Sequence, residues 1–479
     1  MTSPGLLLKS AQGRGVLAAT ILGSGMAQLD GTVVNVALPR IGNDLHAGLT
    51  ALQWTVNAYT LTLSGLLLLG GSLGDRLGRR RIFVLGVLWF TAASAGCTVA
   101  PDAGVLIAMR ALQGVGGALL TPGSLAILEA VFRREDRSAA VGAWSGLGGV
   151  ATAIGPVLGG VLVGVAGWGW RLVFLINVPI AVAVVWLARR YVPETRDDQA
   201  SGRVDVLGAA LAALGLAGVV YGLTDGPQHG WSPLLVASLV VGAALLVAFV
   251  VVEARIAHPM MPLSLFRSRN FSAANVVTLV VYAALSGALF LIPVQLQRVS
   301  GFAPVEAGSA LLPVTVVMLL LSARMGRVAE RIGPHLPMTV GPIVAGTGLA
   351  LLSRIGPRAS YVSDVLPPLL VFSLGLSTTV APLTATVLAA APNHLVGVAS
   401  AVNNDVARAA GLLAVAVLPG LAGITPAAYD HPAQLSTGFH HAVVIAGGLC
   451  ALGGVLSALF VTSRRDEDGE TSALAAVRP

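Results

Sequence analysis

The chain has 479 residues, of which 55% are hydrophobic and only 11% are charged, and its formal net charge is +7. Soluble domains contain about 25% charged residues, so this composition excludes a soluble enzyme and indicates a polytopic membrane protein. The basic residues form short clusters between apolar runs, as in the cytoplasmic loops of membrane proteins, so no nucleic-acid partner is expected.

Apolar runs of about 20 residues, the length of helix that crosses a bilayer, follow one another along the chain. Fourteen such runs are bounded by charges, proline or glycine. They predict an all-α polytopic protein rather than an outer-membrane barrel of short alternating strands. The predicted spans cover approximately residues 15–38, 51–73, 82–100, 104–129, 139–164, 171–188, 204–224, 233–253, 271–296, 304–326, 336–354, 363–390, 396–422 and 438–462.

The distribution of basic residues predicts the orientation in the membrane. Of the 29 lysines and arginines, 22 fall on the side that carries both termini and five on the other side. Basic residues accumulate in cytoplasmic loops. We therefore expect a protein of the cell membrane with both termini in the cytoplasm.

A repeated segment divides the chain into halves. Gly71 to Gly78, GSLGDRLG, follows the second span and recurs after the tenth as Gly326 to Gly333, GRVAERIG, displaced by 255 residues. Two six-span halves plus an inserted pair would give this distance, and a parallel repeat with a central cavity is a transporter architecture. The expected parts are a first half at 1–190, an inserted pair at 191–254, a second half with its preceding linker at 255–462, and a disordered cytoplasmic tail at 463–479.

Four motifs carry a resemblance to a known family. The segment Gly71 to Arg81, GSLGDRLGRRR, resembles the signature loop between helices 2 and 3 of the major facilitator superfamily. Leu29 to Pro39, LDGTVVNVALP, is similar to the first-helix motif of its fourteen-helix drug:proton antiporter family. Arg110 to Gly114 resembles the fourth-helix motif of that family, and Gly146 to Gly160 its antiporter motif. The resemblance implies proton-driven export of amphiphilic, often cationic, small molecules.

One full negative charge, Asp30, lies inside the first span, where an ionisable group is by default a candidate functional site. Asp30 is ~24 Å from the cytoplasmic start of its span, and Arg110 is ~9 Å from the outer start of the fourth. Their depths are similar, so we expect them to meet across a cavity. Burial favours a neutral carboxyl and a nearby guanidinium a charged one, so a change in their separation gives a physical basis for proton coupling. A static ion pair between two helices is the alternative.

The repeated loop is expected to act as a gate, in which charge-assisted contacts to helix ends hold one face of the protein closed. An ordinary basic loop is the alternative, but it explains neither the acidic residue nor the second copy. The gate residues are Gly71, Asp75, Arg76, Gly78, Arg79 and Arg80 of the first copy, and Glu330 and Arg331 of the second.

The antiporter motif of the fifth span removes one backbone hydrogen bond and side-chain bulk at several positions. A helix of this kind is expected to kink and to slide against a partner, and a static packing kink is the alternative. The residues concerned are Gly155, Pro156, Gly159 and Gly160.

Further polar or aromatic residues within the spans are candidates for the substrate cavity, although each also fits interhelical hydrogen bonding or the interfacial aromatic belt. Asp405 and Arg408 are included because their spacing puts them on one face of the thirteenth span. For these two, a self-neutralising local pair is an equal alternative. The other candidates are Asn35, Trp54, Asn57, Tyr59, Gln113, Asn275, Tyr282 and Gln295.

Several chemistries are not expected. The only lysine, Lys9, lacks the preceding glycine of a phosphate-binding loop, so ATP is not the expected energy source. The eight histidines show no metal-binding spacing. We therefore predict no enzymatic activity, cofactor, metal or obligate protein partner. Two alternatives to drug antiport stay open: uptake or export of one endogenous metabolite or lipid, and a membrane sensor or scaffold that transports nothing.

Overall fold

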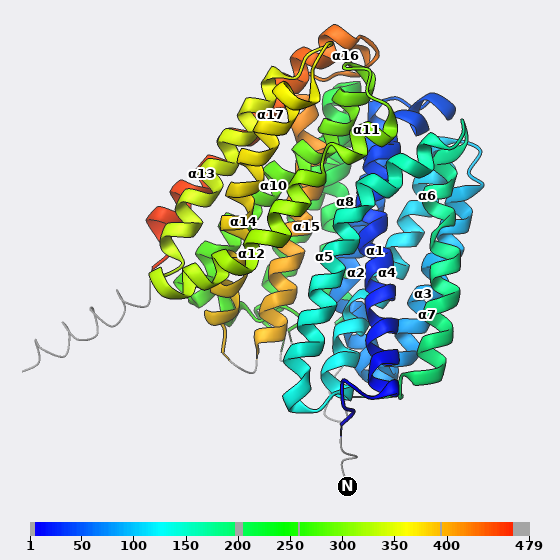
Figure 1. Ribbon diagram of the computed structural model, residues 1–479, viewed down its shortest axis with the longest axis vertical. Coiled ribbons are helices and arrows are strands. Elements are labelled where there is room, and N and C mark those ends of the chain that lie inside the picture. Colours follow the sequence, from blue (N-terminus) through cyan, green and yellow to red (C-terminus); the bar gives the residue numbers. More distant parts are fainter. Residues whose placement is uncertain (1–4, 197–204, 257–258, 393–394, 463–479) are drawn as a thin grey trace, which may run out of the picture. The chain divides into compact units, whose positions relative to one another are not determined.

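The computed structural model describes residues 5–196, 205–256, 259–392 and 395–462, so the expected tail at 463–479 lies outside the described residues. Within these ranges the secondary structure is helical, apart from turns, loops and one isolated bridge between Leu6 and Phe132 (Figure 1). The prediction of an all-α protein is confirmed.

The number of membrane-crossing helices also agrees with the sequence. Thirteen helical segments of the described residues are long and apolar enough to cross a membrane. A further helix, α1 (Ala11–Asp44), has 34 residues, which exceeds the about 20 that a bilayer requires. Its apolar character is diluted by the charges of Arg14, Asp30 and Arg40. With α1 the total is the predicted fourteen.

The chain forms two compact units, Met1–Met260 with Phe302–Ser309, and Met261–Gly301 with Ala310–Pro479. The boundary at Met260 lies close to the expected start of the linker at residue 255, and the finer three-part division stays a prediction. The first unit contains α1, α2 (Leu49–Leu77), α3 (Arg79–Thr98), α4 (Ala103–Val131), α5 (Arg134–Gly164), α6 (Leu172–Leu175), α7 (Asn177–Tyr191), α8 (Val206–His229), α9 (Pro233–Glu253) and α11 (Pro304–Ser309).

The second unit packs its helices through backbone contacts at small residues. A Cβ atom on Gly346 would lie 2.4 Å from the carbonyl oxygen of Gly447, so α13 and α17 approach each other as closely as glycine allows. Its helices are α10 (Arg269–Arg298), α12 (Leu312–Ile332), α13 (His335–Leu351), α14 (Leu366–Ala389), α15 (Val396–Leu421), α16 (Pro426–Asp430) and α17 (Pro432–Phe460).

The repeat found in the sequence is also present in the backbone. Gly78, with φ +112°, caps the C-terminal end of α2, and Gly333, with φ +88°, caps that of α12. Both angles lie in a region that residues with a side chain rarely adopt, so each copy needs glycine at this position.

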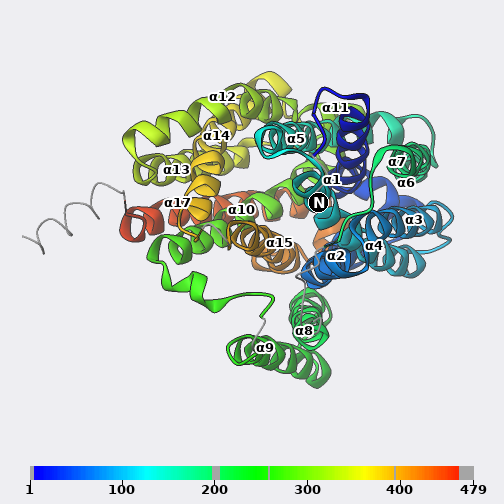
Figure 2. The same cartoon turned by 90° about the horizontal axis from the view of Figure 1, so that it is seen from below.

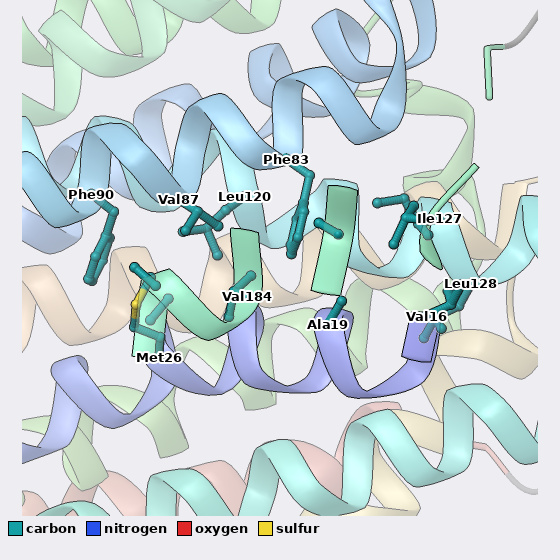
Figure 3. Packing of buried hydrophobic residues seen from close by; sticks show 14 of the residues in the cluster. Val16, Ala19, Met26, Phe83, Val87, Phe90, Leu120, Ile127, Leu128 and Val184 are labelled. Carbon is teal, nitrogen blue, oxygen red and sulfur yellow. The ribbon is translucent and has the colours of Figure 1, made fainter. Parts of the chain in front are cut away.

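A hydrophobic cluster in the first unit joins α1, α3, α4 and α7 (Figure 3). Phe83 and Phe90 of α3 are fully buried in it, as is Val184 of α7. A Cβ atom on Gly23 of α1 would lie 2.5 Å from the ring of Phe83, so the glycine makes room for the aromatic side chain. Helices in lipid associate through close packing of this kind.

The inserted pair, α8 and α9, packs as two neighbouring helices (Figure 2). α8 also contacts α2, where the Trp54 indole donates a hydrogen bond to Asp225 at 2.9 Å and packs against the ring of Tyr221. Most of α9 is exposed, including Val240 and Val247, which suits a helix that faces lipid.

Candidate functional site

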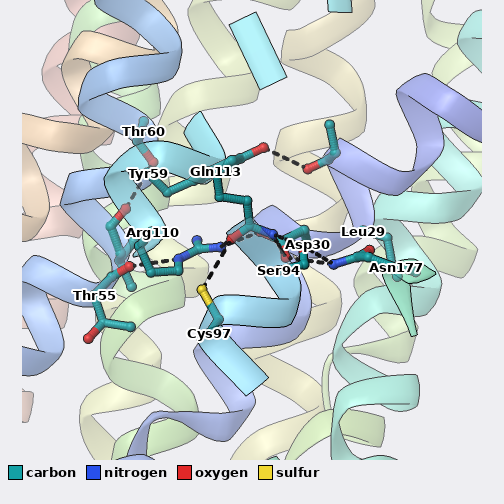
Figure 4. A network of polar contacts seen from close by, with 12 residues as sticks. Leu29, Asp30, Thr55, Tyr59, Thr60, Ser94, Cys97, Arg110, Gln113 and Asn177 are labelled. Atoms are coloured by element: carbon teal, nitrogen blue, oxygen red, sulfur yellow. Dashed lines mark hydrogen bonds and ion pairs between the residues drawn. The ribbon is translucent and has the colours of Figure 1, made fainter. Parts of the chain in front are cut away.

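Asp30 lies in the middle of α1 and has no exposed surface. Its Oδ2 atom forms an ion pair with Arg110 of α4, and Oδ1 accepts hydrogen bonds from Gln113 Nε2 at 2.8 Å and from Asn177 Nδ2 at 3.2 Å (Figure 4). A buried charge needs such partners. Asp30 and Arg110 therefore meet, as their similar depths predict, and their role in proton coupling stays a prediction.

The start of α4 sets the depth of Arg110. Asp102 caps this helix, because its Oδ1 atom accepts a hydrogen bond from the backbone N–H of Val105 at 2.9 Å. Arg110 follows two turns into the helix. Gln113 is three residues further on, which places both side chains on the same face.

Helix α2 holds the guanidinium of Arg110 in place. Arg110 Nε donates to the carbonyl oxygen of Thr55 at 3.0 Å, and the guanidinium carbon lies 4.4 Å from the centroid of the Tyr59 ring. Arg110 Nη1 also donates to Gln113 Oε1 at 2.6 Å. A cation over an aromatic face is stabilised by about 2 kcal/mol when it is desolvated, so α2 helps to keep this charge buried.

Further polar groups join α3 and α7 to the ion pair of Asp30 and Arg110. Ser94 Oγ accepts hydrogen bonds from Gln113 Nε2 at 2.7 Å and from Asn177 Nδ2 at 3.2 Å. The thiol of Cys97 lies 3.9 Å from Gln113 Oε1. Ser94, Cys97 and Asn177 were not among the site residues predicted from the sequence. An asparagine within the apolar run of α7 was the available signal.

The arginine-rich loop binds the segment that follows α7. Asp75 pairs with Arg79 at 2.7 Å across the break between α2 and α3. Glu194 Oε1 accepts the backbone N–H of Arg80 at 3.1 Å, and its Oε2 atom lies 3.7 Å from Nε of both Arg80 and Arg81. Glu194 was not among the site residues predicted from the sequence. These contacts join the start of α3 to the segment after α7, and the gate role of the loop stays a prediction.

Gly78 is the residue around which this loop turns. Its Cβ atom, if present, would lie 2.6 Å from Glu194 Oε1, and its φ of +112° is unfavourable for alanine. We expect Gly78→Ala to cost about 1–3 kcal/mol, measured as a fall in Tm. Gly74→Ala is the matched control, because its Cβ atom meets nothing within 4 Å. Equal Tm values for the two variants would contradict this account.

Other gate candidates have fewer contacts. Gly71 is partly buried, and a Cβ atom there would make only ordinary contact with Pro122, at 3.5 Å. The ion pairs of the described residues include none with Arg76, Glu330 or Arg331, of which the last two are exposed. The gate stays a prediction, for both copies of the motif.

Pro156 in α5 leaves a backbone carbonyl free, and α1 binds it. Proline has no N–H, so the carbonyl of Thr152, four residues earlier, lacks its helical partner. Thr32 Oγ1 lies 3.1 Å from this oxygen and 3.0 Å from the carbonyl of Leu29, and donates its proton between them. A Cβ atom on Gly155 would lie 2.0 Å from Thr32 Oγ1, so glycine is required at this contact.

A double-mutant cycle tests the role of Thr32. Thr32→Val removes the hydroxyl and is expected to cost about 1–3 kcal/mol, because the carbonyl of Thr152, which already lacks its helical partner, is left unbound. In a Pro156→Ala background the new N–H can bond Thr152, so the same change should cost almost nothing. Unfolding of the four proteins in detergent measures the coupling, and Thr32→Ser should retain the bond. If the costs of Thr32→Val and Pro156→Ala simply add, the proposed role of the hydrogen bond from Thr32 to Thr152 would be wrong.

The remaining glycines of the antiporter motif pack by backbone contact. A Cβ atom on Gly159 would lie 2.8 Å from the carbonyl of Val33 in α1, and one on Gly160 would lie 2.5 Å from that of Pro304 in α11. Conversely, a Cβ atom on Gly308 of α11 would lie 2.1 Å from the carbonyl of Pro156. These contacts establish close packing, and the hinge function stays a prediction.

Comparison with known proteins identifies the family. The Major Facilitator Superfamily profile matches residues 20–416. The chain belongs to the Major Facilitator Superfamily. It is 35% identical to the tetracenomycin C resistance and export protein of Streptomyces glaucescens, over 84% of this chain and 74% of that protein. It is also 35% identical to a puromycin resistance protein of Streptomyces alboniger, over 97% and 93% of the two chains.

Solved structures share this superfamily fold. A bacterial homologue of the human lysosomal transporter Spinster has a TM-score of 0.68 and 16% identity, over 94% of this chain and 97% of that one. A POT family transporter has a TM-score of 0.67, also at 16% identity, over 93% and 97% of the two chains. The predicted major facilitator architecture is therefore confirmed.

The polar cavity candidates in the first unit of this Major Facilitator Superfamily protein have different surroundings. Tyr59 donates its hydroxyl to a carbonyl of α1 at 3.1 Å, and Trp54 bonds to α8, so both join helices. In contrast, Asn57 is 1% exposed, and neither of its amide atoms has a hydrogen-bond partner among the described residues. The Oδ1 atom of Asn35 is likewise buried without one. The assignment of these residues to a cavity stays a prediction.

Two candidates in the second unit join helices. Asn275 Oδ1 accepts a hydrogen bond from Asn403 Nδ2 at 3.1 Å, which connects α10 to α15. Gln295 Nε2 donates to Ser436 Oγ at 3.1 Å, which connects α10 to α17. Interhelical hydrogen bonding of this kind is the alternative to a cavity role for such residues.

Asp405 and Arg408 form no close ion pair in the described part of the chain, although the charge of Arg408 acts on Asp405 through space, and the local-pair reading stays open. The ion pairs of the described residues include none between these two side chains. Asp405 Oδ1 is a buried atom without a hydrogen-bond partner in the described part of the chain. Their position on one helix face therefore does not bring the carboxylate of Asp405 into a close ion pair with the guanidinium of Arg408. The cavity role of both residues, and of the partly buried Tyr282, stays a prediction.

Proposed function

We propose that this protein exports amphiphilic, often cationic, drugs or antibiotics across the cell membrane in exchange for protons, by alternating access. The names of its relatives, which refer to resistance and export, support the direction of transport. The observation that carries the proton coupling is the fully buried carboxylate of Asp30, which has Arg110, Gln113 and Asn177 as donors.

The hydrogen bonds to Asp30 suggest how a change of conformation would control proton binding. Arg110, Gln113 and Asn177 donate to the two oxygens of Asp30 and so favour its charged form, and withdrawal of one of these donors would raise its proton affinity. Movement of α4 or α7 away from α1 would favour protonation, and the return of Arg110 would expel the proton. An equilibrium shifts only by the difference in ligand affinity between its states, so proton and substrate must favour different states.

Inside-out membrane vesicles with an acidic lumen test this proposal. A panel of a lipophilic cation, a zwitterion and a neutral drug should show accumulation of at least one compound, coupled to proton efflux and abolished by a protonophore. Accumulation without proton efflux would reject antiport. Transport in the opposite direction would favour uptake, and the absence of transport for every compound would favour a sensor or scaffold.

We further propose that both termini lie in the cytoplasm, on the side where 22 of the 29 basic residues are predicted to lie. Single cysteines at two exposed positions test this, because native Cys97 and Cys450 are buried. In intact cells, a membrane-impermeant maleimide should label Ser360→Cys and leave Arg134→Cys unlabelled. The reverse pattern would invert the topology.

A further inference from the structure

A groove of about 390 Å³ lies between the first turns of α3 and the last turn of α7 in the first unit. Three arginines line one part of it and three aliphatic side chains the other: Arg80, Arg81, Arg189, Val84, Leu85 and Leu88. Leu85 and Leu88 are 49% and 48% exposed. The groove therefore combines a cationic end with an accessible apolar wall, on helices that cross the membrane.

The positive charge of this groove is only partly compensated. Arg80 donates to the carbonyl of Val192 at 3.0 Å and is thereby fixed. Arg81 is 66% exposed and lies 3.7 Å from Glu194, beyond hydrogen-bond distance, while Arg189 is exposed and forms no ion pair within the described ranges. Three guanidinium groups thus line the groove, and the carboxylate of Glu194 is shared between Arg80 and Arg81.

We propose that this groove binds an anionic phospholipid. Its phosphate would lie between Arg81 and Arg189, because guanidinium groups match phosphate oxygens in charge and geometry. One acyl chain would cover Val84, Leu85 and Leu88. Basic pockets between membrane helices at the headgroup level suit acidic lipids, and the adjoining apolar wall distinguishes this ligand from a free phosphate. The bound phosphate would also compete with Glu194 for Arg81.

Native mass spectrometry of the detergent-purified full chain, titrated with dioleoylphosphatidylglycerol or dioleoylphosphatidylcholine, tests this site. Phosphatidylglycerol should bind more tightly than phosphatidylcholine. Arg81→Gln and Arg189→Gln should each raise its Kd about fivefold, and the double variant about 25-fold. Both side chains are exposed, so the Tm without lipid should not change. Leu88→Asn should weaken phosphatidylglycerol binding through the lost acyl contact.

The matched control is Arg190→Gln, which removes the same charge one residue away from the groove lining. Its Kd should stay near that of the parent protein. If Arg190→Gln raised the Kd as much as Arg189→Gln, binding would not depend on the residues that line the groove, and the proposed site would be rejected. Inorganic phosphate is the second control. If it displaces phosphatidylglycerol at equal concentration, or if Leu88→Asn has no effect, the groove is an anion site and not a lipid site.

Discussion

Asp30→Asn is expected to reduce proton-coupled export to the level of vesicles that lack the protein. The asparagine cannot exchange a proton, and it leaves the guanidinium of Arg110, only 1% exposed, without its counter-ion. Removal of one partner from a buried ion pair costs about 3–5 kcal/mol, so the Tm should fall as well. Export in vesicles and unfolding in detergent measure the two effects separately.

A second variant separates coupling from structural damage. Asp30→Asn combined with Arg110→Gln removes both charges, so no uncompensated charge is left buried. The double variant should therefore regain much of the lost Tm while export stays absent. If it also regained export with the pH dependence of the parent protein, the ion pair would be a static link between α1 and α4, and the proposed role of Asp30 would be wrong.

Gly114→Ala is expected to be the most damaging small substitution in α4. Its Cβ atom would lie 2.0 Å from Thr62 Oγ1 and 2.3 Å from the carbonyl oxygen of Tyr59, so α2 would have to move away. Because α2 carries the carbonyl and the ring that hold Arg110, the displacement would also disturb the ion pair. We expect a loss of about 1–3 kcal/mol in the free energy of unfolding and a loss of export.

Gly123→Ala is the matched control, in the same helix. A Cβ atom there would lie 3.5 Å from that of Phe83, an ordinary contact distance, and alanine favours a helix over glycine. The Tm of this variant should equal or exceed that of the parent protein. A Gly114→Ala protein with an unchanged Tm would show that α2 and α4 have more freedom than their contact distances indicate.

The sequence predicted features that depend on distance along a helix. The helical rise placed Asp30 and Arg110 at similar depth. Helix number, the repeat and the family also follow from the length, spacing and order of motifs. Each of these features depends only on residues within one span or on the order of segments along the chain.

Features that depend on how neighbouring helices are rotated could not be predicted in the same way. The free carbonyl at Thr152 follows from Pro156 alone, but the sequence does not show that Thr32 is the donor that reaches it. Ser94 and Asn177 are likewise ordinary polar residues until packing turns them toward Asp30. Glu194 lies outside any span and acquires its role through tertiary contact.

The short helix α11 belongs to one unit, although the chain on both sides of it belongs to the other. Phe302–Ser309 belongs to the first unit, whereas the chain before it, to Gly301, and after it, from Ala310, belongs to the second. Backbone contacts of Gly160 and Gly308 anchor this short helix on α5. Two covalent tethers, one at each end of α11, must therefore absorb any displacement of one unit against the other. The tenth predicted span, 304–326, is thus divided between the two units at Ser309 and Ala310.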